Sequence, residues 1–306
     1  MSSAVYHIPI LLKECLEGLS INPDGTYVDV TFGGGGHSKV ILEQLGENGR
    51  LFAFDQDADA KAQAKSIDDK RFVFIEANFR HIQKYLRVYR VSQVDGILAD
   101  LGISSHQIDD PSRGFSTRFD GELDMRMNQQ ATFTAKQLVN EYSIEQLHRI
   151  FGMYGEVTNA RTLASALFAA RTNKPIHTTQ ELKAVLQKFA PRGKENKYFA
   201  QVFQAIRIEV NDELKALEEF LTQVPDLLSP EGRLAVITFH SLEDRLVKNY
   251  IQKGKFYGEV EKDIFGNELR PLQSVTRKPI EASPAEIAHN SRARSAKLRV
   301  ATLYHL

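Results

Sequence analysis

The chain has 306 residues, of which 42% are hydrophobic and 25% are charged, so it can bury one large core or one core with a smaller satellite domain. Its 39 basic and 39 acidic residues cancel, which excludes a strongly cationic protein, although charge can still be segregated locally. The single Cys15 excludes an internal disulfide framework and a metal site built from several cysteines.

The N-terminus shows no basic region followed by a long apolar run, so we predict no signal peptide. No segment approaches the roughly 18 consecutive apolar residues that a membrane-spanning helix requires. We therefore predict a soluble cytoplasmic protein with no membrane partner.

The chain opens with an entry segment and a helix expected over residues 5–20, where apolar side chains recur on one face. Residues 27–32 then alternate like a strand and lead into four glycines, Gly33 to Gly36. Apolar residues return at helical spacing over residues 40–45. This stretch predicts a strand, a tight glycine loop and a helix whose first N–H groups face a polar or anionic ligand.

Two carboxylates make this loop a candidate cofactor site. Asp29 stands before the glycines, and Asp55 ends the second predicted strand, where doubly wound folds bind ribose hydroxyls. The dinucleotide fingerprint G-x-G-x-x-G is completed in neither frame. An acid before the glycines resembles instead the S-adenosylmethionine loop of Rossmann-like methyltransferases, whose ligand carries a sulfonium cation and no pyrophosphate.

Strands and helices continue to alternate up to Asp100, with helices expected over residues 58–67 and 81–87 and strands over residues 72–76 and 94–100. This rhythm predicts a parallel sheet whose ligands bind outside the carboxyl ends of its strands. Four features fall at such ends: the glycine loop, Asp55, Phe79 and Asp100. Phe79 either flanks an adenine or belongs to the core.

After Asp100 the periodic pattern stops, and residues 101–127 form a predicted long loop of the kind that is usually functional. Helices are then expected over residues 135–146, 159–171, 179–189 and 198–221, before a strand returns at 232–239. We predict an inserted helical domain of residues 111–215 between two parts of a sheet domain, residues 1–110 and 216–306. Its expected task is to recognise the substrate, and dimerisation or packing is the alternative.

Polar residues 240–245 follow the returning strand, and a helix is expected up to about Lys253. Residues 269–275 and 298–303 alternate like a closing pair of strands, with a helix cap at Ser283 between them. Two basic clusters are either solvated faces or RNA contacts. They are Lys188, Arg192, Lys194 and Lys197, and Arg292, Arg294, Lys297 and Arg299.

Seven strings of the sequence resemble one family. They are TFGGGGHS (31–38), DLGISS (100–105), DDPSRGFS (109–116), DGELDMRM (120–127), FQAIRIEVNDEL (203–214), FHSLEDR (239–245) and RARSAKLR (292–299). From His7 to Arg299 the chain resembles the bacterial ribosomal RNA small-subunit methyltransferase H family. The resemblance implies an α/β, Rossmann-like class I methyltransferase with a mostly parallel, doubly wound sheet and an inserted all-helical domain. It also implies methylation of the exocyclic N4 of a cytosine in 16S ribosomal RNA of the small ribosomal subunit, with S-adenosylmethionine as the cofactor.

The resemblance also implies cofactor contacts, which fall on Gly35, Gly36, His37, Asp55, Phe79, Asp100 and Gln107. Two departures from the family pattern bear on the site. His106 replaces a usual proline, which questions the rigidity of the loop that carries Gln107. Residues 198–202 replace a Pro-Ala-Thr-Arg string of many members, which questions substrate contacts from that helix.

The chemistry needs an acceptor that holds an N4–H, because the cytosine amino lone pair is delocalised into the ring; the rest is positioning and desolvation. The Pro-Pro-aromatic string that follows Asp or Asn in many base amino-methyltransferases is missing after Asp100. The candidate acceptors are Asp100, Ser104 and Ser105, unless Asp100 serves only the cofactor. Because the base must be splayed out of folded RNA, we predict substrate contacts at Arg113, Phe115, Arg118, Arg292 and Arg294.

Nine histidines lack metal-ligand spacing, so no metal site is predicted.

A nicotinamide oxidoreductase is one alternative to a methyltransferase, and it would need the missing third glycine. A non-catalytic RNA-binding or assembly factor would need no cofactor rim, and a DNA amino-methyltransferase would be expected to carry the Pro-Pro-aromatic string. The sequence leaves open whether the substrate is naked RNA or an assembled subunit, and whether the protein forms a homodimer.

Overall fold

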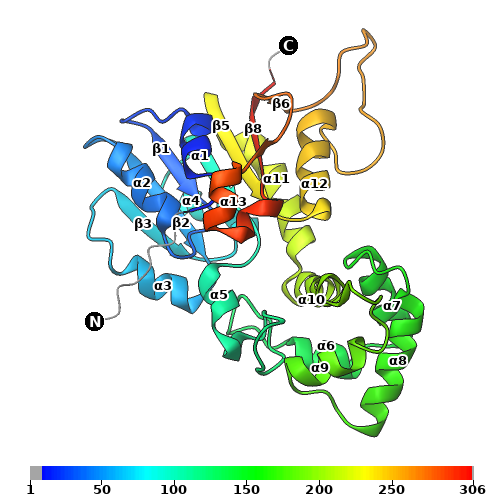
Figure 1. The fold of residues 1–306 in the computed structure, drawn as a ribbon. Coiled ribbons are helices and arrows are strands. Elements are labelled where there is room, and N and C mark those ends of the chain that lie inside the picture. The colour runs from blue at the N-terminus through cyan, green and yellow to red at the C-terminus, as the bar shows by residue number, and fades with distance from the viewer. Residues whose placement is uncertain (1–8, 305–306) are drawn as a thin grey trace. The chain divides into compact units, whose positions relative to one another are not determined.

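The computed structural model describes residues 9–304, so residues 5–8 of the expected entry segment lie outside the described residues. The described chain divides into two compact units (Figure 1). The sheet unit comprises the residues up to Gly102 and from Leu214 onward, and the helical unit is Ile103–Glu213. The helical unit thus begins ahead of the expected residue 111 and ends ahead of residue 215.

Within the described residues, the sheet unit is built on one eight-stranded sheet. The strands are β1 (Thr26–Asp29), β2 (Arg50–Asp55), β3 (Phe72–Glu76), β4 (Val94–Asp100), β5 (Leu228–Thr238), β6 (Leu272–Ser274), β7 (Ile280–Glu281) and β8 (Lys297–Leu303). Their order is β3-β2-β1-β4-β5-β8-β6, with β7 also paired to β8. Strands β1 to β5 pair in parallel, whereas β8 is antiparallel to β5, β6 and β7. This sheet confirms the predicted α/β, Rossmann-like fold.

Helices cover both faces of the sheet (Figure 1). They are α1 (Leu12–Leu19), α2 (Gly36–Gln44), α3 (Ala58–Ala64), α4 (Ile82–Val88), α11 (Glu213–Leu227), α12 (Ser241–Lys253) and α13 (Pro284–His289). Successive strand residues point to opposite faces, so Ile97 packs in a core with α4, α11 and α12, while Leu98 packs in a second core with α1 and α2. Burial on both faces explains why the strands are near-continuous apolar runs.

The helical unit has its own apolar core, formed by residues such as Leu138, Ile150 and Phe203. Its elements are α5 (Ser105–Asp109), the 3-10 helix η2 (Pro111–Arg113), α6 (Ala135–Glu141), α7 (Ile144–Met153), α8 (Ala160–Asn173), α9 (Thr179–Leu186) and α10 (Glu195–Asn211). The expected loop 101–127 therefore contains two short helical turns.

Two expected helices are each divided in the structure. The helix expected over residues 135–146 ends at Glu141, and Ser143 starts α7 with a capping box that includes Gln146. The helix expected over residues 198–221 is broken at Asp212, whose φ of 51° is left-handed and ends α10. None of the helices in the described part of the chain is long and apolar enough to cross a membrane.

Candidate cofactor and catalytic site

The glycine loop joins the end of β1 to the start of α2. Gly35 has a φ of 76°, in the left-handed region that favours glycine, and a Cβ there would lie 2.6 Å from Cζ of Phe32. A Cβ on Gly34 would meet nothing within 4 Å. The loop is therefore tightly turned at Gly35 and open at Gly34, so a ligand can approach the backbone there.

Asp29 braces this loop from within the unit. Its carboxylate is 1% exposed and accepts hydrogen bonds from Ser38 Oγ at 2.7 Å and from the Thr31 backbone N–H at 3.1 Å. Burial raises the pKa of Asp29, and these hydrogen bonds oppose the rise. Ser38 and Thr31 were not predicted as site residues, although they lie inside the quoted TFGGGGHS string.

Asp55 ties the loop to the end of β2. Its Oδ2 accepts a hydrogen bond from the Gly33 N–H at 2.8 Å, and its Oδ1 accepts one from the Asp57 N–H at 2.9 Å. Burial raises the pKa of Asp55 to about 6, against the effect of these two hydrogen bonds. Because a carboxylate has about four acceptor positions, Asp55 keeps capacity for ribose hydroxyls.

Asp100 stands at the end of β4 with an acceptor atom that is not used. Its backbone N–H donates to Thr31 Oγ1 at 2.6 Å, and its Oδ2 lies 3.6 Å from His37 Nδ1. Its Oδ1 is buried and has no hydrogen-bond partner among the described residues. Burial raises the pKa of Asp100 to about 6, the charge of His37 lowers it, and the charges of Asp29 and Glu243 raise it.

His37 is fixed at the start of α2 by a second contact. Its Nε2 lies 3.1 Å from the carbonyl oxygen of Ile10. A carbonyl only accepts, so Nε2 carries the hydrogen and Nδ1 faces Asp100. The 3.6 Å between Nδ1 and the Asp100 carboxylate is within ion-pair range but longer than a hydrogen bond.

Polar residues follow the carboxyl end of β5, the strand that pairs with β4. His240 caps α12 by accepting from the Glu243 N–H at 3.4 Å, and Glu243 Oε2 accepts from the Phe239 N–H at 2.9 Å. Arg299 of the basic tail donates to both carboxylate oxygens of Asp244, at 2.7 and 3.1 Å. This arginine therefore braces β8 against α12.

Phe79 opens the short 3-10 helix η1 (Phe79–His81) after β3. Its ring meets Phe220 of α11 edge-on, with the ring centroids 5.4 Å apart, and the side chain is half-buried. Of the two alternatives for this residue, the structure shows the core contact, while part of the ring stays exposed.

In the helical unit, Gln107 and Ser104 cap α5. Gln107 Oε1 accepts from the Ser104 N–H at 2.9 Å, and Ser104 Oγ accepts from the Gln107 N–H at 3.2 Å. This capping box begins the helix without a proline, and His106 is exposed. Ser105, the first residue of α5, is half-buried. Ser104, Ser105 and Gln107 thus belong to the helical unit, and Asp100 belongs to the sheet unit.

The predicted substrate contacts differ in exposure. Arg113 is 5% exposed and donates to the backbone carbonyls of Arg126 at 2.9 Å and Met127 at 3.4 Å, so its guanidinium braces a loop. Phe115 is buried in the core of the helical unit. The remaining predicted contacts differ from these two, since Arg118 and Arg294 are exposed and Arg292 is half-buried.

Tyr198, the first residue of the string that departs from the family, is buried in α10. Its hydroxyl donates to Asn159 Oδ1 at 2.9 Å. This side chain therefore joins two helices of the core.

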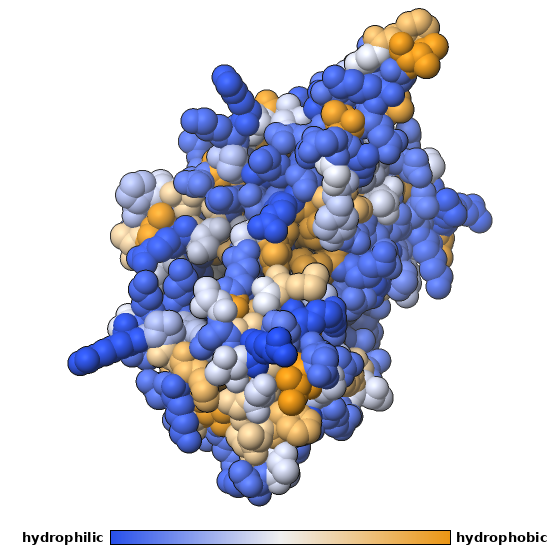
Figure 2. Space-filling view, turned by 90° about the vertical axis from the view of Figure 1, so that its right-hand side faces the viewer, coloured by the Kyte–Doolittle hydropathy of each residue, from blue (hydrophilic) through white to orange (hydrophobic). Residues whose placement is uncertain are grey.

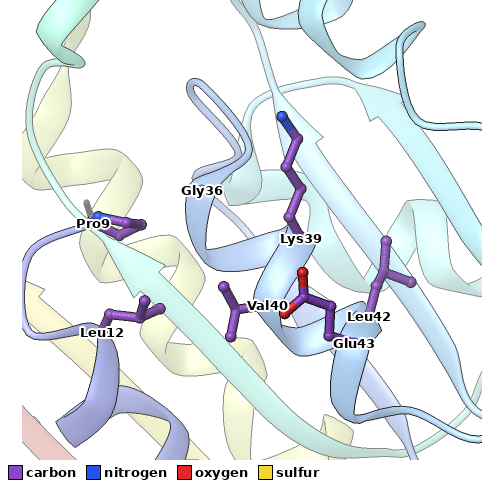
Figure 3. Close-up of a pocket in the computed structure, with 7 residues that line it drawn as sticks. All are labelled: Pro9, Leu12, Gly36, Lys39, Val40, Leu42 and Glu43. Atoms are coloured by element: carbon purple, nitrogen blue, oxygen red, sulfur yellow. The ribbon is translucent and has the colours of Figure 1, made fainter. Parts of the chain in front are cut away.

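A cavity of about 330 Å³ lies beside α2, where Pro9 and Leu12 face Gly36, Val40 and Glu43 (Figure 3). Of the residues that line it, Gly36 alone is a predicted cofactor residue. The described residues contain no group of three histidine, cysteine, aspartate or glutamate side chains that could hold a metal ion.

Comparison with known proteins identifies the family. The model of the MraW methylase family matches residues 4–303. The Ribosomal RNA small subunit methyltransferase H of Cytophaga hutchinsonii is 59% identical over 297 residues, which cover 97% of this chain and 99% of that protein. Proteins of the same name from Amoebophilus asiaticus and Flavobacterium johnsoniae are 55% and 56% identical, over 97% of this chain and 96% and 97% of their own lengths. The chain therefore belongs to the MraW methylase family.

Proposed function

We propose that this chain transfers a methyl group from S-adenosylmethionine to the exocyclic N4 of a cytosine in 16S ribosomal RNA of the small ribosomal subunit. Relatives that are 55% to 59% identical along almost the whole chain are named as methyltransferases of small-subunit ribosomal RNA. The class I methyltransferase fold of the sheet unit agrees with that activity. When bound, S-adenosylmethionine supplies an electrophilic methyl group on a sulfonium centre.

The residues of the rim fit this cofactor. The open face of Gly34 gives access to the loop backbone, and Asp55 offers acceptor positions at the end of β2. A carboxylate at Asp100 suits a ligand that carries positive charge. The residues proposed to hold the cofactor are Gly35, Gly36, His37, Asp55, Phe79, Asp100 and Gln107.

One observation carries the catalytic proposal: the buried Oδ1 of Asp100 has no hydrogen-bond partner among the described residues. Methylation forms an N–C bond at N4, breaks the carbon–sulfur bond, and releases one N4 proton. We propose that Asp100 Oδ1, whose acceptor capacity no described residue uses, accepts an N4–H once the base is bound and then takes that proton. Ser104 and Ser105 are further candidate acceptors, and Ser104 Oγ already accepts one hydrogen bond from Gln107.

The helical unit is proposed to recognise the RNA, with the predicted domain of residues 111–215 as its main part. Among the predicted substrate contacts, Arg118 of the helical unit and Arg292 and Arg294 of the sheet unit keep exposed surface for phosphate contacts. Arg113 and Phe115 would act indirectly, since both are buried. The proposed small-subunit substrate supports a cytoplasmic location, and a homodimer stays a prediction.

The test uses purified protein, tritiated S-adenosylmethionine and small subunits that lack their native methylation, followed by nucleoside analysis. We expect labelled N4-methylcytidine at a single site. Label on another atom or on another class of substrate would contradict the proposal. Measurable cofactor binding without label would retain the cofactor site and reject the substrate.

A further inference from the structure

A hairpin projects from the sheet unit between α12 and β6 (Figure 1). Lys262 and Glu268 face each other as an antiparallel bridge, and the Leu269 N–H donates to the Glu261 carbonyl at 2.8 Å. The Asp263 N–H donates to the Asn267 carbonyl at 2.9 Å. The two arms are therefore paired up to the turn.

The turn itself is held by one side chain. Asp263 Oδ1 accepts from the backbone N–H groups of Phe265 at 2.8 Å and Asn267 at 2.9 Å, and its Oδ2 accepts from Asn267 Nδ2 at 2.9 Å. Gly266 has a φ of 89°, which only glycine adopts without strain. The turn Asp-Ile-Phe-Gly-Asn is thus held by hydrogen bonds, which fix the backbone of the two residues between Asp263 and Gly266.

Those two residues are large, apolar and exposed. Ile264 is 92% exposed and Phe265 is 83% exposed, the highest values among large hydrophobic side chains in the described residues. Figure 2 shows a hydrophobic group at the end of a projection from the molecule. Single exposed apolar residues are common, whereas an adjacent pair held on a hydrogen-bonded tip is suited to contact another molecule.

The charges of the hairpin disfavour RNA as that partner. Residues 253–270 contain four basic side chains, Lys253, Lys255, Lys262 and Arg270, and four acidic ones, Glu259, Glu261, Asp263 and Glu268. Three of the basic groups already form ion pairs: Lys253 with Glu259 at 3.5 Å, Lys255 with Glu261 at 2.9 Å and Arg270 with Glu268 at 3.1 Å. Contacts to phosphate supply most RNA affinity and need excess positive charge, so a protein surface fits the tip better.

The size of the tip disfavours a second copy of this chain. An aromatic side chain buries roughly 150–250 Å², and isoleucine is smaller, so the two side chains together bury less than about 500 Å². A stable protein interface takes about 800 Å² from each partner. The tip is therefore too small to hold a dimer alone, but it suits a protein already brought close by other contacts, as on the particle that carries the target RNA.

We propose that Ile264 and Phe265 dock into an apolar pocket of a protein on the small ribosomal subunit. The inference rests on the proposed function and deepens it, because a substrate bound in this way is an assembled, protein-bearing particle. An aromatic and an aliphatic side chain on a preformed turn are ordered before binding, which lets a two-residue anchor contribute strongly.

The test compares the double variant Ile264→Ser/Phe265→Ser with Val88→Ser, which removes another hydrophobic side chain of the sheet unit that is 72% exposed. Binding to assembled small subunits and to protein-free 16S ribosomal RNA is measured by cosedimentation without cofactor. We expect the double variant to raise the Kd for subunits about tenfold or more and to leave the Kd for naked RNA unchanged. Val88→Ser should change neither.

A third variant, Asp263→Ala, loosens the turn and keeps the apolar pair, so we expect a smaller loss of subunit binding. Equal losses on subunits and naked RNA would show that the tip contacts RNA and overturn the proposal. An unchanged Kd of the double variant for subunits would also overturn the proposal. So would sedimentation equilibrium that shows the unaltered protein as a dimer and the double variant as a monomer. Because binding is read without methyl transfer, failure of docking is distinguishable from failure of the proposed reaction.

Discussion

The sheet unit and the helical unit use their polar side chains in different ways. In the sheet unit, parallel strands bring Asp55 and Asp100 to the same rim as the glycine loop, and Asp100 keeps an oxygen to which no described residue donates a hydrogen bond. In the helical unit, Gln107 caps a helix and Arg113 braces a loop. The carboxylates at the strand ends thus keep acceptor positions for a ligand, whereas these two side chains of the helical unit hold local structure.

The largest expected effect tests whether the acceptor belongs to the sheet unit. Asp100→Asn keeps the shape of the side chain but removes its ability to take the N4 proton, so we expect kcat to fall by about 10²–10⁴-fold. Cofactor affinity is measured in parallel by calorimetry. Ser105→Ala, from the helical unit, should cost less than about tenfold. An equal loss in Ser105→Ala would move the acceptor to the helical unit, and methyl transfer by Asp100→Ala with unchanged cofactor affinity would remove Asp100 from both roles.

A second pair of variants tests the helical unit. Arg113→Ala removes hydrogen bonds to two backbone carbonyls, so we expect a loss of about 1.5–3 kcal/mol in the free energy of unfolding, followed by thermal denaturation. Arg118→Ala makes the same charge change at an exposed position and should alter stability by less than about 0.5 kcal/mol, while raising KM for the RNA substrate. If Arg113→Ala kept its Tm and weakened RNA binding, the buried arginine would be a ligand contact after all.

Alanine substitutions at the adjacent Gly34 and Gly35 separate the stability of the cofactor loop from its affinity for the cofactor. Gly35→Ala places a Cβ against Phe32 at a left-handed φ, so we expect a loss of about 1–3 kcal/mol in stability. Gly34→Ala meets open space and should leave the Tm unchanged while lowering cofactor affinity, because its methyl group enters the face where a ligand approaches. Unchanged affinity in Gly34→Ala would place the ligand elsewhere.

The smallest expected effect concerns pH. Asp55 and Asp100 have pKa values of about 6, so both are ionised at neutral pH and take up protons as the pH falls through 6. We expect cofactor affinity to fall on acidification, by at most about tenfold per pH unit for each group. Titrations in Asp55→Asn should show a shallower dependence, and an affinity that is constant from about pH 7 to about pH 5 would exclude both carboxylates as contacts.

The stability of the protein without cofactor responds to pH in the opposite direction. Both pKa values are raised above the ordinary aspartate value of about 4. Between that value and about 6, the folded state therefore holds protons that the unfolded chain has released. These two groups make the fold less stable as the pH rises through this window, and their contribution is constant above it.

Most of the sheet unit could be predicted because each strand is an apolar run with a polar end. The strand expected over 94–100 is β4 with the same bounds. Ser143 and Gln146 have the spacing of a capping box, so the sequence contains a signal for the start of α7. The apolar pattern continues across this point, and for that reason one helix was expected over residues 135–146. The break at Asp212 was not expected, because a left-handed φ is uncommon at a non-glycine residue.

The site could be predicted in part, for a related reason. Strand ends located Asp55 and Asp100 because topology, and not local sequence, gathers them. The burial of Asp29 and Arg113 could not be predicted, because a charged side chain normally indicates surface. Each charge is compensated by contacts made in the fold: Ser38 and Thr31 donate to the Asp29 carboxylate, and the Arg113 guanidinium donates to two backbone carbonyls.

The placement of the helical unit between β4 and β5 has a consequence for folding. These strands are direct neighbours, with Asp100 opposite Ile237, yet the whole of residues 101–227 is synthesised between them. Because closing a long flexible loop costs entropy, the pairing is favoured once the intervening segment has become compact. The helical unit has its own apolar core and lies wholly between the two strands in the sequence, so it is expected to fold before they pair as the chain emerges. The centre of the sheet, and with it the rim that carries Asp100, is then completed late in synthesis.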